Sequence, residues 1–362
     1  MSMFANRKDR TLYVYDGAAN YIVAYIFQII LQLLFTIILI ATMTVEERNG
    51  FSHTSTYVYI ICIVNEISIG LTPLSYSKVL GQNYYKDMGF KKMLDIKQIL
   101  LLVAIAVFTI CAFAPLATYV KQFFDITGFD SSNLTSLEVK DAGSLIGGIL
   151  LLALMPAILE EILYRGMLAR ALTRKSFVFA IFMGGFMFAL MHGNPVQFVH
   201  QFFLGVVCCI VYFASGSIYA SIIVHFINNT IAVVGSYIAY LHPFTIPTYA
   251  SILMIVVGII ILSILLYVFI YIANKNAKLS RGIKAFNQVF AECFEKPIED
   301  NKQEMISQAI KESGIEEIQE VYEQKRVLIS QDEALKSRRA MIFAIFLAAF
   351  IFVVNTVSGY IS

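Results

Sequence analysis

The chain has 362 residues, of which 58% are hydrophobic and 14% are charged, and its formal net charge at pH 7 is +2. Soluble domains contain about 45–50% apolar and about 25% charged residues, so this composition excludes an ordinary soluble globular protein. Nucleic-acid binding is not expected either, because no basic stripe accompanies a recognisable binding module. The composition therefore predicts an all-α fold, a polytopic transmembrane helical bundle.

The apolar stretches predict about nine membrane spans, since a helix needs about 20 apolar residues to cross the bilayer. We expect spans at 20–43, 55–76, 97–119, 143–164, 177–193, 197–214, 217–240, 247–273 and 340–361. The stretch at 177–193 is the shortest and the weakest candidate for a complete crossing.

Basic residues gather in alternate loops, which predicts the orientation of the bundle. They lie before the first span and after the second, fourth and eighth (Arg7, Lys8, Arg10; Lys78, Lys86, Lys91, Lys92; Arg170, Arg174, Lys175; Lys275, Lys278, Arg281, Lys284). We therefore expect the N-terminus in the cytoplasm and the C-terminus outside.

The segment 274–339 differs from the rest, being rich in Glu, Lys and Gln with apolar residues at roughly helical spacing. It predicts a cytoplasmic amphipathic helical insert before the last span. A solvated helical hairpin and a docking or regulatory element remain open for this insert. The resulting organisation is N-terminal transmembrane helices at 1–139, a transmembrane core at 140–273, the insert, and a C-terminal transmembrane helix at 340–362.

Two adjacent carboxylates, Glu160 and Glu161, lie inside the fourth predicted span. Ionisable side chains at that depth are costly and are usually functional. Neighbours on a helix point about 100° apart, so only one of the two can face a given cavity. Arg165 follows Glu161 at the spacing at which helical side chains meet. We expect these two to pair and Glu160 to face inward, although a purely structural ion-pair network is the alternative.

Two histidines and an asparagine are predicted to reach the level of Glu160. Counted from a turn near Lys175, Glu160 lies about 22 Å and His192 about 25 Å away, so an antiparallel hairpin brings them level. His225 and Asn229 share one face of a later span. A carboxylate and an imidazole can together deprotonate a water molecule. A second imidazole and an amide can donate hydrogen bonds to the oxyanion that forms.

These residues resemble a known family through three ordered motifs. The chain has E-E-x-x-x-R at 160–165, F-x-x-x-H in Phe188 and His192, and H-x-x-x-N in His225 and Asn229. It resembles the CAAX-protease and bacteriocin-processing (CPBP, Abi-domain) family of intramembrane glutamic endopeptidases. The resemblance covers about residues 140–240, so the core at 140–273 is interpreted as catalytic. The insert and the ninth span depart from the family pattern.

The resemblance implies a role for each matched residue. Glu160 and His192 would activate water, His225 and Asn229 would hold the oxyanion, and Glu161 and Arg165 would support them (Glu160, His192, His225, Asn229, Glu161, Arg165). It implies no cofactor and no metal. The expected partners are a peptide or protein substrate, presented at the cytoplasmic face, and the lipid bilayer. An integral membrane protein in the plasma membrane of a bacterium is the expected location, and the oligomeric state stays open.

Two other functions use the same residues. Glu160, His192 and His225 form a His2Glu set, a ligand type known for catalytic zinc, so a zinc-dependent variant is an alternative. The second is a non-catalytic bacteriocin self-immunity or peptide-binding membrane protein.

Four further side chains lie outside the proposed catalytic set. Phe188 is expected to pack, and His200 to lie at the membrane interface. Asn65 and Glu66, inside the second span, either line the cavity, bond to the fourth span, or join helices as polar contacts.

Overall fold

The computed structural model describes residues 12–52, 54–79, 84–129, 139–276 and 316–361, and in these ranges every regular element is a helix. Within these ranges eight helices are long and apolar enough to cross a membrane, and the helix Phe177–Met191 is apolar but shorter. The expected all-α, multi-pass membrane architecture is therefore confirmed, and eight candidate spans with one shorter apolar helix agree with the expected number of about nine.

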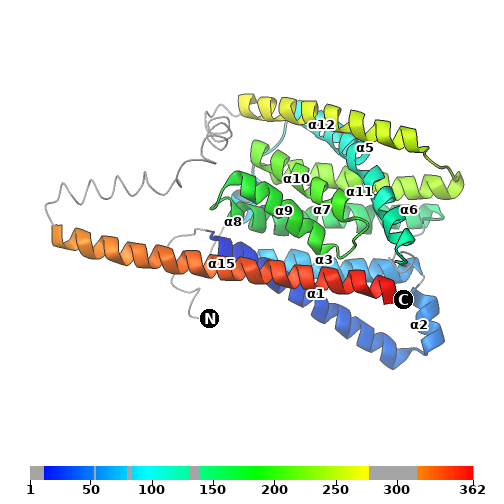
Figure 1. Cartoon of the computed structure of the whole chain (residues 1–362), viewed down its shortest axis with the longest axis horizontal. Helices are drawn as coiled ribbons and strands as arrows, with labels where there is room; N and C mark the ends of the chain where they lie inside the picture. Colours follow the sequence, from blue (N-terminus) through cyan, green and yellow to red (C-terminus); the bar gives the residue numbers. More distant parts are fainter. Residues whose placement is uncertain (1–11, 53, 80–83, 130–138, 277–315, 362) are drawn as a thin grey trace.

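The helices pack side by side with their long axes roughly aligned (Figure 1). α9 to α11 lie in the middle, with α5 and α12 on one side and α1, α3 and α15 on the other. Their bounds are α1 Val14–Thr42, α2 Val45–Ser52, α3 Ser55–Val79, α4 Tyr84–Asp87, α5 Ile96–Ile126, α6 Ala142–Gly148, η2 Ile149–Leu154, α7 Met155–Glu161, η3 Ile162–Ala169, α8 Arg170–Leu172, α9 Phe177–Met191, α10 Phe198–Ser215, α11 Ile218–Leu241, α12 Thr248–Asn276 and α15 Glu316–Ile361.

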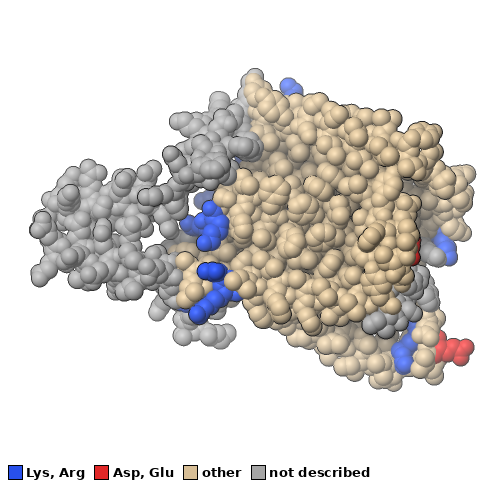
Figure 2. Space-filling model, in the orientation of Figure 1, with Lys and Arg blue, Asp and Glu red and all other residues tan. Residues whose placement is uncertain are grey.

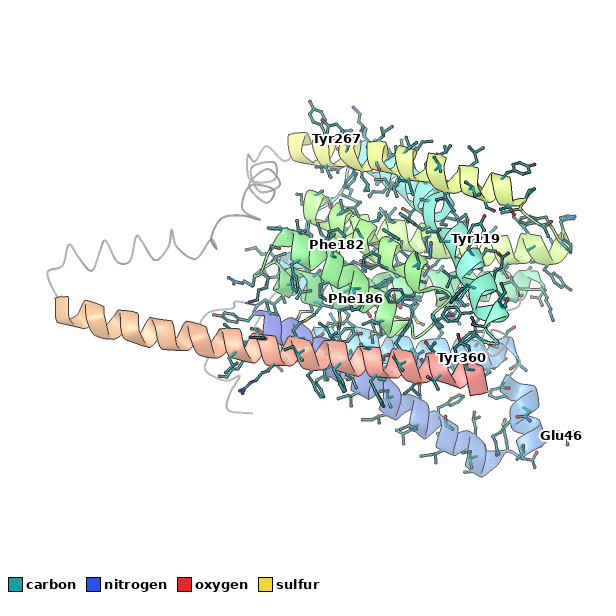
Figure 3. All side chains as sticks on the ribbon, in the orientation of Figure 1. Glu46, Tyr119, Phe182, Phe186, Tyr267 and Tyr360 are labelled. Atoms are coloured by element: carbon teal, nitrogen blue, oxygen red, sulfur yellow. The ribbon has the colours of Figure 1, made fainter. Side chains whose placement is uncertain are left out.

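Charged side chains lie towards the two ends of the bundle, and the broad middle of the face in Figure 2 carries none. The outer surface of that middle zone is apolar: Tyr267 on α12 is 73% exposed and Phe182 on α9 is 54% exposed (Figure 3). A wide apolar belt between charged ends is the surface that a lipid bilayer requires.

The first helix begins earlier than its hydropathy predicts, at Val14 instead of residue 20. The extra turn and a half carries Asp16, and Asn20 follows directly after it; both side chains are fully buried. Asp16 accepts a hydrogen bond from the Tyr76 hydroxyl at 3.1 Å, and the Asn20 amide donates to the Thr72 carbonyl at 3.4 Å. Hydropathy counts these polar residues against a span, whereas partners on α3 satisfy them inside the bundle.

The fourth span is one continuous helix, 31 residues long, from Ala142 to Leu172. It begins at Asp141, whose carboxylate accepts the Ser144 backbone N–H at 2.7 Å, and this bond lowers the pKa of that carboxyl. Two segments, η2 and η3, adopt the wider π-helix and flank α7, the short helix that carries both glutamates. π-Helical turns are rare and frequently occur at functional sites.

The close approach of α9 and α10 depends on glycine. A Cβ built on Gly185 would lie 2.8 Å from the Phe202 carbonyl oxygen and 2.8 Å from Val206 Cγ2. On the facing helix, a Cβ on Gly205 would lie 2.7 Å from the Gly185 Cα. Gly185 and Gly205 thus permit the two helices to pack closely.

Gly185→Ala should therefore destabilise the protein by about 1–3 kcal/mol, the usual cost of overpacking, because backbone atoms are in the way. Thermal unfolding of the detergent-solubilised protein measures this loss. Gly235→Ala on α11 is the matched control, since a Cβ there meets nothing within 4 Å. That variant should be neutral or slightly stabilising. Equal unfolding temperatures for both variants would contradict the packing argument.

The last helix, α15, runs without interruption for 46 residues from Glu316 to Ile361. It passes through the boundary at 339/340 that separates the predicted insert from the predicted last span. Most of the insert, residues 277–315, lies outside the described part of the chain. Near its C-terminal end, Asn355 donates a hydrogen bond to the Gly193 carbonyl at 3.3 Å. α15 therefore reaches the loop that follows α9.

Candidate active site

The two glutamates approach the two nitrogens of one imidazole. Glu161 Oε1 lies 2.9 Å from His225 Nδ1, and Glu160 Oε2 lies 3.8 Å from His225 Nε2. Glu161 and His225 are buried, and Glu160 is 9% exposed. A carboxylate only accepts hydrogen bonds, so His225 Nδ1 carries the proton. The remaining nitrogen, Nε2, faces Glu160.

The predicted pairing of Glu161 with Arg165 is confirmed. Arg165 Nη1 donates to Glu161 Oε1 at 2.6 Å, and both side chains are fully buried. Its second nitrogen, Nη2, donates to the Gly205 carbonyl at 2.8 Å, and its guanidinium lies 4.9 Å from the Phe188 ring centroid. The guanidinium neutralises Glu161 inside the bundle and ties the fourth span to α10.

The second candidate histidine, His192, lies at the C-terminal end of α9. Its Nδ1 is 2.8 Å from the Phe188 carbonyl oxygen. A carbonyl is an acceptor only, so Nδ1 carries the proton and Nε2 keeps its lone pair. In the described residues His192 makes no direct hydrogen bond to Glu160. The fourth span and α9 do lie at the same height, as the antiparallel hairpin predicts: Tyr164 packs edge-on against Phe188, and their ring centroids are 4.9 Å apart.

Phe188 joins the candidate residues by packing, as expected. It is fully buried, and its ring centroid lies 4.7 Å from that of His192 and 5.5 Å from that of His225. The same ring carries the Arg165 guanidinium on its face. One aromatic side chain thus fixes the positions of both imidazoles and of the cation.

The asparagine of the third motif lies one turn beyond His225. Asn229 donates to the Leu152 carbonyl, in the π-helical segment η2, at 3.3 Å, and accepts from Asn228 at 3.2 Å. Its amide has a second N–H that these contacts leave available. The widened turn of η2 therefore helps to position the residue predicted to bind the oxyanion.

His200, which was expected at the membrane interface, lies in the first turn of α10. It is partly buried and lies near Asn228, His192 and His225, so it faces the site from α10. No motif included His200 or Asn228, because both lie in stretches whose apolar residues dominate the pattern. A helical projection of α10, which shows which residues share its inner face, was the signal that could have identified His200.

Glu66 and its neighbour Asn65 face different helices. Asn65 accepts a hydrogen bond from Gln32 of α1 at 2.7 Å, a polar contact between helices. Glu66 is 4% exposed, and its carboxyl contacts that of Glu160. The hypothesis that one of them reaches the fourth span thus holds for Glu66. The helix–helix interpretation holds for Asn65.

Glu66→Gln should lower cleavage by at least about tenfold, since it removes the charge of a carboxyl group beside Glu160 and leaves the side-chain volume almost unchanged. The measurement is the cleavage rate per folded molecule. Asn65→Ala is the matched control: it should lower thermal stability through the lost Gln32 contact and leave the specific activity unchanged. Wild-type activity in Glu66→Gln would show that the two carboxyls are not coupled in function.

Several buried polar atoms in this region make no hydrogen bond within the part of the chain that the structure describes. They include Glu160 Oε2, Glu66 Oε2, His200 Nδ1 and Asn228 Oδ1. Buried polar groups are nearly always hydrogen-bonded, and in a membrane interior an unmet group is especially costly. A water molecule or a peptide group beside these atoms would supply the hydrogen bonds that they lack. Among the described residues, no three His, Cys, Asp or Glu side chains are arranged to hold a metal ion.

Residues 142–231 match a family model described as type II CAAX prenyl endopeptidase Rce1-like. Over these residues the chain is similar to the CAAX-protease family. The match contains all three motifs and confirms the family inferred from them. The Rce1-like segment spans 90 of the 362 residues, from the start of the fourth span to the middle of α11. Comparison with curated proteins and with solved structures gave no match.

The family points to a protease embedded in the membrane that acts on a peptide or protein. In this Rce1-like segment the fourth span supplies the glutamates, α9 supplies His192, and α11 supplies His225 and Asn229. α15 lies outside the matched residues, yet it contacts the segment at Gly193.

Proposed function

We propose that the protein is an intramembrane glutamic endopeptidase that needs no metal and hydrolyses a peptide bond at the cytoplasmic face. The observation that carries the proposal is the arrangement at Glu160 Oε2, which is buried, makes no hydrogen bond within the described residues and faces His225 Nε2 at 3.8 Å. A buried acceptor of this kind is suited to hold a water molecule.

In this mechanism Glu160 and His192 hold the attacking water. Glu160 offers a free carboxylate oxygen, and His192 offers the lone pair of Nε2, because its Nδ1 donates to Phe188. As the water oxygen bonds to the substrate carbonyl carbon, one of its protons passes to Glu160. When the C–N bond breaks, Glu160 returns that proton to the leaving amine.

The oxyanion would be held by His225 and Asn229. His225 donates through Nε2 when its imidazole is protonated, and the carboxylate of Glu161 stabilises that cation through Nδ1. Asn229 donates through its remaining amide N–H. Donors aimed at a developing negative charge in a site that excludes water contribute strongly to catalysis. Glu161 and Arg165 act through His225 and are positioning residues.

The substrate is proposed as a peptide or protein segment that enters from the cytoplasm. The name of the matched family refers to prenylated CAAX termini. For a protein of a bacterial plasma membrane, we propose leader or peptide processing instead of CAAX processing. Both substrates supply an amide carbonyl, so the proposed chemistry is the same for either.

The test compares peptide termini in membranes from cells that carry wild-type protein or Glu160→Ala at equal expression. Termini that occur only with the wild type establish a protease and identify its substrate. His192→Ala should give the same pattern as Glu160→Ala. Identical termini in all three samples, in cells that tolerate the matched toxin peptide, would support the self-immunity alternative and reject catalysis.

Metal dependence has its own test. The activity of the purified protein should survive a strong chelator, because the proposed mechanism uses only side chains. Loss of activity that zinc restores would favour the zinc alternative with Glu160, His192 and His225 as ligands.

A further inference from the structure

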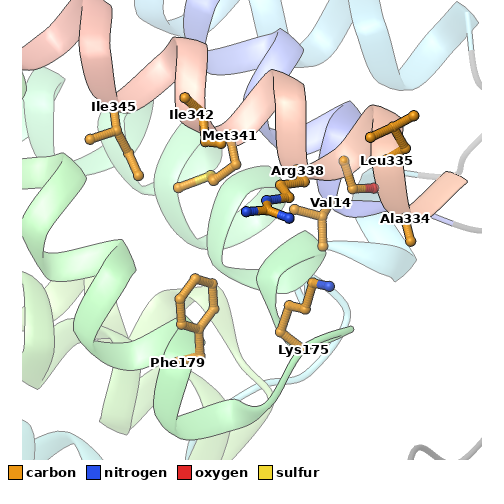
Figure 4. Close-up of a pocket in the computed structure, with 10 residues that line it drawn as sticks. Val14, Lys175, Phe179, Ala334, Leu335, Arg338, Met341, Ile342 and Ile345 are labelled. Carbon is orange, nitrogen blue, oxygen red and sulfur yellow. The ribbon is translucent and has the colours of Figure 1, made fainter.

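A cavity of about 520 Å³ lies between α15 and the turn from α8 to α9. Figure 4 shows its lining, in which Met341 and Ile345 of α15 face Phe179 of α9, with Val14 of α1 close by. The volume falls within the range of small-molecule sites in proteins. α15 closes this cavity against the Rce1-like segment, although α15 itself lies outside the matched residues.

Two positively charged side chains lie at one end of the apolar lining. Lys175, in the turn before α9, and Arg338 of α15 both line the cavity and extend into the space between their helices (Figure 4). Within the described ranges neither forms an ion pair with an acidic side chain, and Ser337 beside them is buried. A cavity with apolar walls and an unneutralised pair of cations suits a ligand with an apolar body and an anionic head.

The position of the cavity indicates where such a ligand comes from. Arg338 lies near the start of the span Ala334–Val357, at the end of the bundle where lysines and arginines gather (Figure 2). The neighbouring apolar side chains continue onto the lipid-facing surface: Ile342 is 57% exposed and Phe179 is 37% exposed. The cavity therefore opens onto the bilayer at headgroup depth.

We propose that this cavity is a binding site for an anionic phospholipid of the adjacent leaflet. The phosphate would lie between Lys175 and Arg338, and the first acyl carbons would contact Phe179, Met341 and Ile345. Basic pockets between transmembrane helices on the cytoplasmic side bind anionic headgroups in this way. A zwitterionic lipid carries its own cation beside the phosphate, so it gains less from the two basic side chains. The bound lipid would join α15 to α9.

The test is thermal unfolding of the full-length protein in detergent with added phosphatidylglycerol or phosphatidylcholine. Phosphatidylglycerol should raise the unfolding temperature of the wild type clearly more than phosphatidylcholine does. Lys175→Gln combined with Arg338→Gln should remove that difference. Lys91→Gln combined with Lys97→Gln is the matched control, because it removes two exposed charges elsewhere and should keep the difference.

Each of the other outcomes rejects the proposal. Equal shifts with the two lipids, or a full phosphatidylglycerol effect in the Lys175/Arg338 variant, would mean that the cavity has no anionic lipid. Stabilisation by inorganic phosphate alone, with no further gain from the lipid, would identify a phosphate site instead. The single variants Lys175→Gln and Arg338→Gln, each of which should halve the lipid effect or more, provide the test if the double variant fails to fold.

Discussion

Glu160→Gln should lower the cleavage rate of the purified protein by about a thousandfold, within the usual range for the loss of a general base. The amide has almost the same volume as the carboxylate, so the protein should fold and unfold as the wild type does. What changes is the base: an amide oxygen cannot take the proton of the attacking water. The measurement is kcat/KM on the substrate identified from the peptide termini.

The control for this experiment is the amount of folded protein, determined by size-exclusion chromatography at the same detergent concentration. Substrate binding by Glu160→Gln should persist, because the donors of His225 and Asn229 remain. Cleavage at the wild-type rate would reject Glu160 as the base. Protection against a toxin peptide by Glu160→Gln, with no cleavage by either protein, would favour the non-catalytic alternative.

Arg165→Met should destabilise the protein by about 3–5 kcal/mol, the usual cost of leaving one member of a buried ion pair without its partner. Glu161 would then be a fully buried carboxylate that keeps its contact with His225 but has lost its cation. The Gly205 carbonyl, which anchors α10, would lose its donor as well. We expect little folded protein in detergent extracts of cells that express this variant.

A second variant separates folding from catalysis. Arg165→Met combined with Glu161→Gln removes both charges of the pair, and neutral replacements of buried ion pairs are often tolerated. The double variant should recover folded protein, whereas cleavage should stay low because an amide cannot stabilise a protonated His225. Full folding of Arg165→Met alone would show that Glu161 is not charged in the bundle. Full activity of the double variant would show that His225 works without the charge of Glu161.

Much of the fold follows from the sequence because a bilayer sets the length of each apolar helix. The ends of α3, α10 and α11 lie within a few residues of the predicted spans, since charged or polar loops bound them. The helical spacing of Glu161 and Arg165 predicted their ion pair, which is a local contact. Packing of Phe188 followed in the same way from its place one turn before His192.

The remaining features depend on contacts between distant segments. The π-helical turns on both sides of the glutamates are not encoded in hydropathy, because the same residues would satisfy an ordinary α-helix. The contact of Glu66 with Glu160 joins residues 94 positions apart, so no local pattern specifies it. The approach of His200 to Asn228 is of the same kind, because it depends on the packing of α10 against α11. The catalytic roles of Glu160, His192, His225 and Asn229 stay predictions.

The length of α15 has a mechanical consequence. A helix of 46 residues is about 69 Å long, more than twice the roughly 30 Å thickness of the hydrocarbon core. Its first part must therefore stand in water as a rod, while Asn355 near the other end holds the carbonyl of Gly193, the residue after His192. A force that tilts the rod in the aqueous phase moves its far end as well. α15 thus links the aqueous surface of the protein mechanically to the backbone at Gly193, next to the candidate catalytic residue His192.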